Sequence, residues 1–415
     1  MLTTGGGNSL IRTLSWPLIR HSVSRHLSGI EGLEHVPAHG AFILAPNHTS
    51  YYDHFLLTVV LQALRGTPTW YLTKSEAFAG TTSRLWHESW YSIPVDRQGP
   101  STDTLRAIRS ALSAGAALCV YPEGTRGPGG SLLPFKDGPF RFGIMGDVPV
   151  IPVGIHGSNE VLPRKSMRTR RTRARVVFGP ALSDARVGSN PTRAGFMRAE
   201  GARVVEGLLT RAADPSCGHS PEHANTVARV IDAQIMSHLD ERGRVAAPQV
   251  RRLARLARLA RGTGPGSVDL DVQRVRLVGL RATNAPLVLR PLLAAPVRSG
   301  ARRVLAAQPD HPMANYLLGR WYLVMPAVFG GGARRAVEPL TRANDSSPSG
   351  DTRALTALAE AELACGHPEA ARTALLAVIA QTEHEGRGSA RITRARQALD
   401  RIPVPVALAS SGVAS

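Results

Sequence analysis

The chain contains 415 residues, of which 43% are hydrophobic and 20% are charged, so it can bury two or three domain-sized cores and is neither disordered nor fibrous. Its formal net charge of +19 indicates an acidic partner, for which nucleic acid, anionic lipid and phosphorylated small molecules are the candidates. The three cysteines, Cys119, Cys217 and Cys365, are far apart and odd in number, which argues against a disulfide scaffold and favours a reducing cytosol.

The N-terminal segment 1–27 is predicted to be an amphipathic helix broken at Pro17. Its apolar residues are flanked by Arg12, Arg20 and Arg25, an arrangement that suits a membrane surface. It has no continuous apolar stretch of the kind that a secretory signal needs. The longest apolar run of the chain, FLLTVVLQAL, is too short to cross a bilayer. We therefore expect any membrane contact to be peripheral, at the cytoplasmic face.

Buried apolar runs alternate with helical patterns over residues 28–212. The predicted strands are 41–46, 69–74, 148–155 and 174–182, with a further strand that enters a turn within 116–124, and the predicted helices are 53–64, 102–115 and 191–212. This alternation predicts an α/β domain with a mostly parallel sheet flanked by helices. In such domains functional sites gather in the loops beyond the carboxyl ends of the strands.

The composition changes after residue 213, where the chain becomes rich in alanine, leucine and arginine. Residues 213–300 are predicted to be a linker and a basic helical region, with one strand-like run, DLDVQRVRLVGL, at 269–280. Residues 301–382 are predicted to form helical hairpins, and residues 383–415 a last helix and a flexible tail. The second half of the chain is therefore predicted to be a mainly α-helical domain.

Two imperfect units spaced by 35 residues suggest a helical-hairpin repeat within 301–382. ARRAVEPL aligns with EAARTALL, which places Ala336 over Ala371 and Leu340 over Leu375. The spacing is close to that of tetratricopeptide repeats, about 34 residues. An insertion, AVFGGG, interrupts the first unit. An alanine-rich helical domain without true repeats is the alternative. A buried helical stripe begins the region, at Ala314, Leu317, Leu318, Trp321, Tyr322 and Met325.

The stretch APNHTSYYDHF places a histidine and an aspartate after a predicted strand. On one continuous helix, five residues would leave His48 and Asp53 about 140° apart, too far to pair. If His48 lies in the turn after the strand and Asp53 in the first turn of the next helix, imidazole and carboxylate can meet. Such a pair is what a polarised general base requires.

A second loop, YPEGTRG, also follows a predicted strand. Glycine at 124 permits close backbone approach, and the guanidinium of Arg126 matches phosphate oxygens. Arg97 lies in the intervening YSIPVDR, and Lys136 follows in FKDGPFRFGI. Taken singly, each of these residues has an ordinary explanation. Arg97 could be a surface charge, and Glu123 and Arg126 could form a local ion pair. Their occurrence together in this order favours a common site.

At these motifs the sequence resembles the glycerolipid acyltransferase superfamily, whose best-known members are the 1-acylglycerol-3-phosphate acyltransferases. The resemblance covers about residues 28–210 and rests on four motifs in the family's order. They are NHTSYYD, YSIPVDR, YPEGTRG and VPVIPVGI. The second motif departs from the family pattern between Tyr91 and Val95, where the family commonly has glycine and an aromatic residue, so acceptor contacts there can differ.

The resemblance implies a role for each motif residue. His48 would be the general base that deprotonates the acceptor hydroxyl, and Asp53 would orient it. The acyl donor would be acyl-coenzyme A or acyl carrier protein, and no metal or cofactor is expected because a thioester is already activated. The apolar fourth motif would support the site or line the acyl path. The implied acceptor and phosphate contacts are Lys74, Arg97, Gly124, Thr125 and Arg126, with Glu123 fixing the arginine or the turn.

Two basic runs, 164–175 and 251–262, suggest contact with an anionic membrane surface. A solvated basic loop or helix is the alternative for both. Nucleic acid is not expected as a partner, since the chain has no recognition module and few aromatic residues to stack bases. Cys217, His219 and His223 lie close in sequence, but a fourth ligand is missing nearby and we do not interpret them as a metal site.

Three functions are compatible with the sequence. The first is a membrane-surface acyltransferase that acylates a lysophospholipid, most simply 1-acylglycerol-3-phosphate to phosphatidic acid. The second is an acyltransferase of the same fold with another lipid acceptor, which the unusual second half favours. The third is a degenerate lipid-binding scaffold whose helical repeats bind a protein partner. The presence of His48, Asp53, Glu123 and Arg126 argues against the third.

Overall fold

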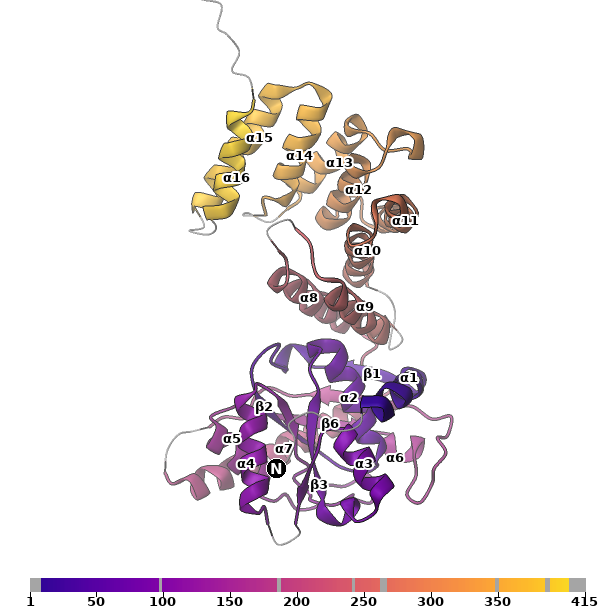
Figure 1. Ribbon diagram of the computed structural model, residues 1–415, viewed down its shortest axis with the longest axis vertical. Coiled ribbons are helices and arrows are strands. Elements are labelled where there is room, and N and C mark those ends of the chain that lie inside the picture. The colour runs from indigo at the N-terminus through magenta and orange to yellow at the C-terminus, as the bar shows by residue number, and fades with distance from the viewer. Residues whose placement is uncertain are drawn as a thin grey trace, which may run out of the picture. The chain divides into compact units, whose positions relative to one another are not determined.

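The computed structural model describes residues 9–96, 99–184, 188–240, 243–261, 267–347, 351–384 and 389–402. These residues form two compact units. The first extends to Ser237 and includes Arg251–Leu270, and the second comprises His238–Val250 and the described residues from Asp271 onward. Every strand that the structure describes belongs to the first unit (Figure 1).

The first unit is built on a seven-stranded sheet with the order β1-β7-β6-β2-β5-β3-β4. Strands β2 to β6 run parallel, whereas β7 is antiparallel to β6 and parallel to β1. The carboxyl ends of β2, β3, β5 and β6 therefore meet at one edge of the sheet. The predicted, mostly parallel sheet is confirmed. The strands are β1 Leu27–Glu31, β2 Phe42–Pro46, β3 Thr69–Lys74, β4 Ser92–Val95, β5 Ala117–Cys119, β6 Val150–His156 and β7 Ala174–Phe178.

Helices cover both faces of this sheet. Ile43 and Ala45 of β2 share a buried cluster with Phe140 and Met197 from helices on one face. Alternate residues of a strand point to opposite faces, so Phe42 and Leu44 face the other layer of helices. The helices of the first unit are α1 Ser9–His26, α2 Tyr52–Arg65, α3 Thr81–Ser89, α4 Thr102–Ser113, α5 Gly138–Gly146, α6 Ser158–Val161, α7 Asn190–Ala213 and α8 Pro221–Ser237.

Two sequence predictions were wrong. Helix α1 is continuous through Pro17 instead of breaking there. Proline removes one backbone hydrogen bond, but the packing of α1 on α2, with buried Ile19 and Val23, holds the flanking turns together. The strand-like run at 269–280 lies in helix α10 (Val268–Thr283), because a short apolar run cannot by itself distinguish strand from helix. The division between the units falls within α10 and within α9 (Ala247–Arg261).

The second unit is mainly helical, as predicted. Each helix packs against the next along the chain, and α12 with α13 and α14 with α15 form hairpins. The aligned residues Ala336, Leu340, Ala371 and Leu375 are all buried. Its identity as a tetratricopeptide array stays a prediction. The helices are α11 Arg290–Ala307, α12 Pro312–Val324, α13 Ala333–Asp345, α14 Arg353–Cys365, α15 Pro368–His384 and α16 Ser389–Asp400.

Candidate active site

His48 lies at the carboxyl edge of the sheet, two residues beyond β2. The side chain of Asn47 fixes the end of this strand, because its Nδ2 donates to the carbonyl of Ile155 at 2.9 Å and its Oδ1 accepts the Ile155 N–H at 2.7 Å. Both polar ends of the amide are thus satisfied by β6. These two hydrogen bonds set the position from which the chain turns into α2.

The turn brings the imidazole of His48 and the carboxylate of Asp53 together. Nδ1 of His48 lies 2.9 Å from Oδ2 of Asp53, which is in the first turn of α2. The same oxygen accepts the backbone N–H groups of Thr49 at 2.9 Å and Ser50 at 3.0 Å. The side chain of Asp53 is fully buried, so its charge acts on the histidine with little screening by water. The carboxylate thereby fixes both the loop and the orientation of the ring.

The geometry leaves the second ring nitrogen of His48 available for a proton. Because Nδ1 faces Asp53, Nε2 is the atom that can accept a proton from a substrate. The ring of Tyr121 stacks on the imidazole, with centroids 3.8 Å apart and planes inclined by 23°. The histidine side chain is only 10% exposed. One face of the ring is thus held by an aromatic residue.

The third motif holds the backbone of His48 on both sides. Oε1 of Glu123 accepts the N–H of His48 at 2.6 Å, while Oε2 accepts the N–H of Leu133 at 2.9 Å. The N–H of Gly127 donates to the carbonyl of His48 at 2.7 Å. Burial raises the pKa of the Glu123 carboxyl, and its hydrogen bonds to Leu133 and His48 oppose that rise. Glu123 therefore fixes the turns of two motifs and makes no ion pair with Arg126.

Cationic side chains gather beside this turn. Gly124 has φ of +65°, and a Cβ there would lie 3.0 Å from Nζ of Lys136, so the glycine allows the lysine to approach the loop. The guanidinium of Arg126 lies 3.9 Å from the ring centroid of Tyr51. Arg164 donates to the carbonyl of Arg126 and, at 3.1 Å, to that of Gly127. Three positive charges thus adjoin the loop that holds His48.

The remaining predicted acceptor contacts are Thr125, Lys74 and Arg97. Thr125 is exposed in the same loop. Lys74 ends β3 at the same edge of the sheet, with β5 between β3 and the strand that precedes His48. Arg97 lies outside the described residues. The structure therefore brings together His48, Asp53, Glu123, Gly124 and Arg126, and leaves the roles of Lys74, Thr125 and Arg97 as predictions.

Four titratable side chains buried near His48 and Asp53 are neutral at pH 7. Burial lowers the pKa of His54 to about 3, with the nearby His48 lowering it further. Burial likewise raises the pKa of Tyr71, Tyr121 and Cys119 well above their ordinary values. No cation from these neighbours therefore competes with His48 for the charge of Asp53. A positive charge that forms on His48 during a reaction is stabilised by that carboxylate.

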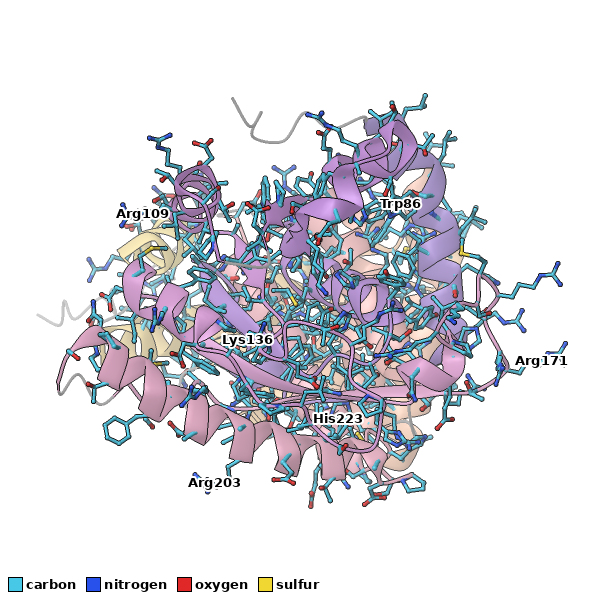
Figure 2. All side chains as sticks on the ribbon, turned by 90° about the horizontal axis from the view of Figure 1, so that it is seen from below. Trp86, Arg109, Lys136, Arg171, Arg203 and His223 are labelled. Carbon is cyan, nitrogen blue, oxygen red and sulfur yellow. The ribbon has the colours of Figure 1, made fainter. Side chains whose placement is uncertain are left out.

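Three residues near the site, Tyr121, Lys136 and Arg164, are not predicted by the sequence to belong to it. Tyr121 falls within the predicted strand and turn at 116–124, Lys136 follows the third motif, and Arg164 belongs to a basic run. Figure 2 shows Lys136 toward the middle of the view, while Arg171 from the same basic run as Arg164 points outward. The available signal for Tyr121 is that it is an aromatic residue placed directly before Pro122 at the start of the third motif. Arg164 is 38 residues from Arg126, and no local pattern relates them.

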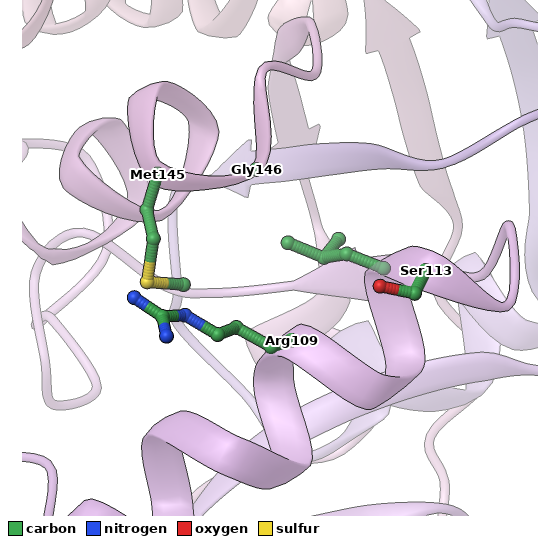
Figure 3. Close-up of a pocket in the computed structure, with 5 residues that line it drawn as sticks. Arg109, Ser113, Met145 and Gly146 are labelled. Carbon is green, nitrogen blue, oxygen red and sulfur yellow. The ribbon is translucent and has the colours of Figure 1, made fainter.

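A small pocket elsewhere on the first unit is separate from this site. It has a volume of about 280 Å³ and is lined by Arg109, Leu112, Ser113, Met145 and Gly146 (Figure 3). Helices α4 and α5 end at Ser113 and Gly146, just before β5 and β6 begin. The pocket thus lies at the amino ends of these strands, on the edge opposite His48.

Cys217, His219 and His223 are not assembled as a set of metal ligands. His219 Nδ1 lies 2.9 Å from the backbone carbonyl of Cys217, whose side chain is buried. Among the described residues, no group of three or more His, Cys, Asp or Glu side chains is placed to hold a metal ion.

The helices described in the structure include none with the length and apolar character needed to span a bilayer. Cys119, Cys217 and Cys365 are all free thiols.

Comparison with known families agrees with the motifs. Residues 28–156 match the family model named Acyltransferase. The chain is 28% identical over 140 residues to a chloroplastic 1-acyl-sn-glycerol-3-phosphate acyltransferase, BAT2, of Brassica napus, covering 33% of this chain and 39% of the relative. It is 26% identical over 155 residues to 1-acyl-sn-glycerol-3-phosphate acyltransferase alpha of Bos taurus, covering 37% and 53%. The resemblance inferred from the four motifs is confirmed for residues 28–156.

The matches span about half the length of these relatives. A 1-acyl-sn-glycerol-3-phosphate acyltransferase of Bacillus subtilis is 26% identical over 124 residues, 30% of this chain and 60% of its own length. Among solved structures, the 1-acyl-sn-glycerophosphate acyltransferase PlsC of Thermotoga maritima is 22% identical with a TM-score of 0.39, covering 49% of this chain and 83% of that chain.

Proposed function

We propose that this protein transfers a fatty acyl group from an acyl thioester to the hydroxyl of a lysophospholipid, most simply 1-acylglycerol-3-phosphate to give phosphatidic acid. The observation that carries the proposal is the 2.9 Å contact between His48 Nδ1 and the buried carboxylate of Asp53, which leaves Nε2 for the substrate. The match of residues 28–156 to the acyltransferase family supports the same chemistry. Acyl-coenzyme A and acyl carrier protein are both suitable donors.

The proposed reaction needs one base and no redox step. Nε2 of His48 takes the proton of the acceptor hydroxyl as its oxygen attacks the thioester carbonyl carbon. The tetrahedral adduct collapses, the carbon–sulfur bond breaks, and the thiolate takes the proton from the imidazolium. The products are an ester and a free thiol. Asp53 stabilises the imidazolium between these two proton transfers, since its carboxylate contacts Nδ1.

The cationic group beside the third motif suits the acceptor phosphate. Arg126 and Arg164 offer guanidinium groups, and Lys136 adds an ammonium whose approach Gly124 permits. We assign further phosphate contacts to Thr125, Lys74 and Arg97 by family analogy. A phosphate held here would place the glycerol hydroxyl near His48, because Glu123 and Gly127 tie the two loops to each other.

We further propose that the enzyme works as a peripheral protein at the cytoplasmic face of a membrane. Helix α1 supports this proposal, because Leu10, Leu14 and Leu18 lie on one side of the helix and are 61%, 67% and 72% exposed. The basic loop within 164–175 adjoins the end of α1, where His26 Nδ1 lies 3.0 Å from the carbonyl of Thr172. Exposed apolar residues beside basic ones suit anionic lipid.

Identification of the product tests the proposed reaction. The purified protein is incubated with long-chain acyl-coenzyme A and a panel of acceptors in mixed micelles, and the lipids are identified by mass spectrometry. We expect phosphatidic acid from lysophosphatidic acid and little ester from monoacylglycerol, which lacks the phosphate. Preferential acylation of an acceptor without phosphate would overturn the assignment of the cationic group and favour another lipid acceptor. Ester formation with no member of a broad panel of donors and acceptors would favour the scaffold function.

A further inference from the structure

The insertion that interrupts the helical pattern of the second unit forms a fixed, projecting turn. Within it, the 3-10 helix η4 (Ala327–Phe329) follows α12. Gly330 N–H donates to the Ala327 carbonyl at 2.8 Å, and Gly331 N–H donates to that of Pro326 at 3.1 Å. A Cβ at position 331 would lie 1.7 Å from the carbonyl oxygen of Met325, so only glycine fits there. The turn therefore has one defined shape.

This turn presents apolar side chains to solvent. Val328 is 86% exposed and Phe329 56% exposed, whereas Met325 just before them is buried. The adjacent end of α12 and the start of α11, with its preceding 3-10 helix η3 (Leu287–Leu289), add further exposed apolar residues. We call this group the apolar tip. It consists of Val288, Leu289, Leu292, Val324, Val328 and Phe329.

Contacts between α11 and α12 place the members of the apolar tip at the same end of the hairpin. Nε1 of Trp321 donates to the carbonyl of Ala294 at 2.9 Å. The guanidinium of Arg298 lies 5.1 Å from the ring centroid of Trp321. A Cβ on Gly330 would lie 3.3 Å from Nη1 of the same arginine. The first turns of α11 thus lie beside the end of α12 and the inserted turn.

The stretch of chain that contains the apolar tip is rich in arginine. Residues 281–335 contain eight arginines and one acidic residue, Asp310, which gives a net charge of +7. Two of the arginines adjoin the turn itself. Arg335 Nη1 donates to the carbonyl of Gly330 at 2.9 Å, and Arg298 Nη1 faces the same glycine. Nε of Arg298 is buried and has no hydrogen-bond partner among the described residues.

We propose that the apolar tip inserts into the interface of an anionic lipid bilayer. Apolar side chains on a projecting turn, flanked by arginines, combine the two terms that hold a protein at such an interface: burial of apolar groups and attraction to acidic head groups. The arginines argue for anionic lipid over an uncharged apolar protein surface. Their guanidinium groups attract acidic head groups, and an uncharged surface would offer them no negative partner. An acidic protein partner is the competing occupant.

This inference does not depend on acyl transfer, and the tip lies outside the residues that match the acyltransferase family. Its contact with lipid should persist in His48→Ala, which removes the proposed base in the other unit. Failure of the two proposals can therefore be told apart. If only the proposed activity fails, the tip still binds lipid; if only the tip proposal fails, the enzyme is active but its tip does not bind lipid.

A probe on the tip of the full-length chain tests the proposal. In a Cys365→Ser background, where Cys119 and Cys217 are buried, Val328→Cys is labelled with an environment-sensitive nitrobenzoxadiazole dye. Leu376→Cys on α15, where the native side chain is 52% exposed, is the matched control in the same unit. The vesicles contain phosphatidylcholine with or without phosphatidylglycerol, and a second set carries brominated acyl chains.

We expect the dye at 328 to shift to the blue and brighten at least about threefold with phosphatidylglycerol vesicles, and to be quenched by brominated chains. The dye at 376 should not respond. Replacing Val328 and Phe329 together by serine should weaken vesicle binding several-fold, whereas serine at Leu363 and Leu376 should not. An unchanged spectrum at 328, or an equal response at 376, would overturn the proposal and favour an acidic protein as the occupant.

Discussion

The carboxylate of Glu123 accepts the backbone N–H of His48 at 2.6 Å, although the two residues are 75 positions apart. This bond joins the loop after β2 to the loop after β5. The second oxygen of the same carboxylate accepts the N–H of Leu133, so one side chain fixes three chain segments around the imidazole. Glu123 is therefore a positioning residue that acts through the backbone of His48.

We expect Glu123→Gln to lower activity while the protein still folds. The amide keeps one acceptor oxygen, but its NH₂ group faces an N–H donor, so one of the two backbone bonds is lost. The loss of such a bond costs about 1–3 kcal/mol of folding stability. The measurements are thermal unfolding and thiol-release kinetics, with Glu34→Gln at an exposed position as control. Equal effects of both substitutions would show that Glu123 does not position His48.

The stacking of Tyr121 on His48 predicts that the ring matters and the hydroxyl does not. Tyr121→Phe keeps the stacked ring and should retain kcat within about twofold, while Tyr121→Leu should lower kcat about tenfold because the imidazole loses its aromatic support. The measurement is kcat for the native chain and the two variants under the same conditions. If phenylalanine failed to rescue the leucine defect, stacking would not be the role of this residue.

Burial of neutral His54 predicts loss of stability in acid. Its folded pKa, about 3, lies below the unfolded value of 6.5, so its contribution is complete above pH 6.5 and declines as the pH falls toward 3. Over that window the unfolded state binds up to one more proton, a slope of at most about 1.4 kcal/mol per pH unit. Denaturant unfolding between pH 7.5 and 4.5 should show a shallower slope for His54→Gln. Parallel curves for the two proteins would contradict the argument.

The cationic group beside the third motif predicts selective loss of the phosphate-bearing acceptor. Arg164→Gln and Lys136→Met should each lower kcat/KM for lysophosphatidic acid about 10- to 100-fold, mainly through KM, and leave KM for the acyl donor unchanged. Arg203→Gln on α7 is the matched control, because Arg203 is exposed and points away from the unit (Figure 2). Loss of donor affinity instead would assign these residues to the thioester.

Much of the first unit could be predicted from local signals. Strands β2 and β6 are buried apolar runs, and α2 ends at Arg65, just before Gly66, whose left-handed conformation marks the helix end. The meeting of His48 and Asp53 also followed from local reasoning, because five residues that cross a strand-turn-helix junction leave few arrangements that join them. Both depend on residues close in sequence.

The remaining features depend on contacts between distant segments. The bond from Glu123 to His48, the approach of Lys136 to Gly124 and the bonds from Arg164 to the third motif join segments that no periodic pattern relates. The continuity of α1 through Pro17 likewise depends on packing against α2, which outweighs the intrinsic cost of a proline within a helix. Tertiary packing decided these cases.

The most direct test of the account is the rate of acceptor-dependent thiol release from a long-chain acyl-coenzyme A, with lysophosphatidic acid in mixed micelles, for the native chain, His48→Ala and His35→Ala. His35 is an exposed histidine outside the site and controls for general effects of the substitution. We predict a loss of at least about a thousandfold for His48→Ala and native rates for His35→Ala. Acceptor-dependent release that is unchanged in His48→Ala would contradict the assignment of His48 as the base.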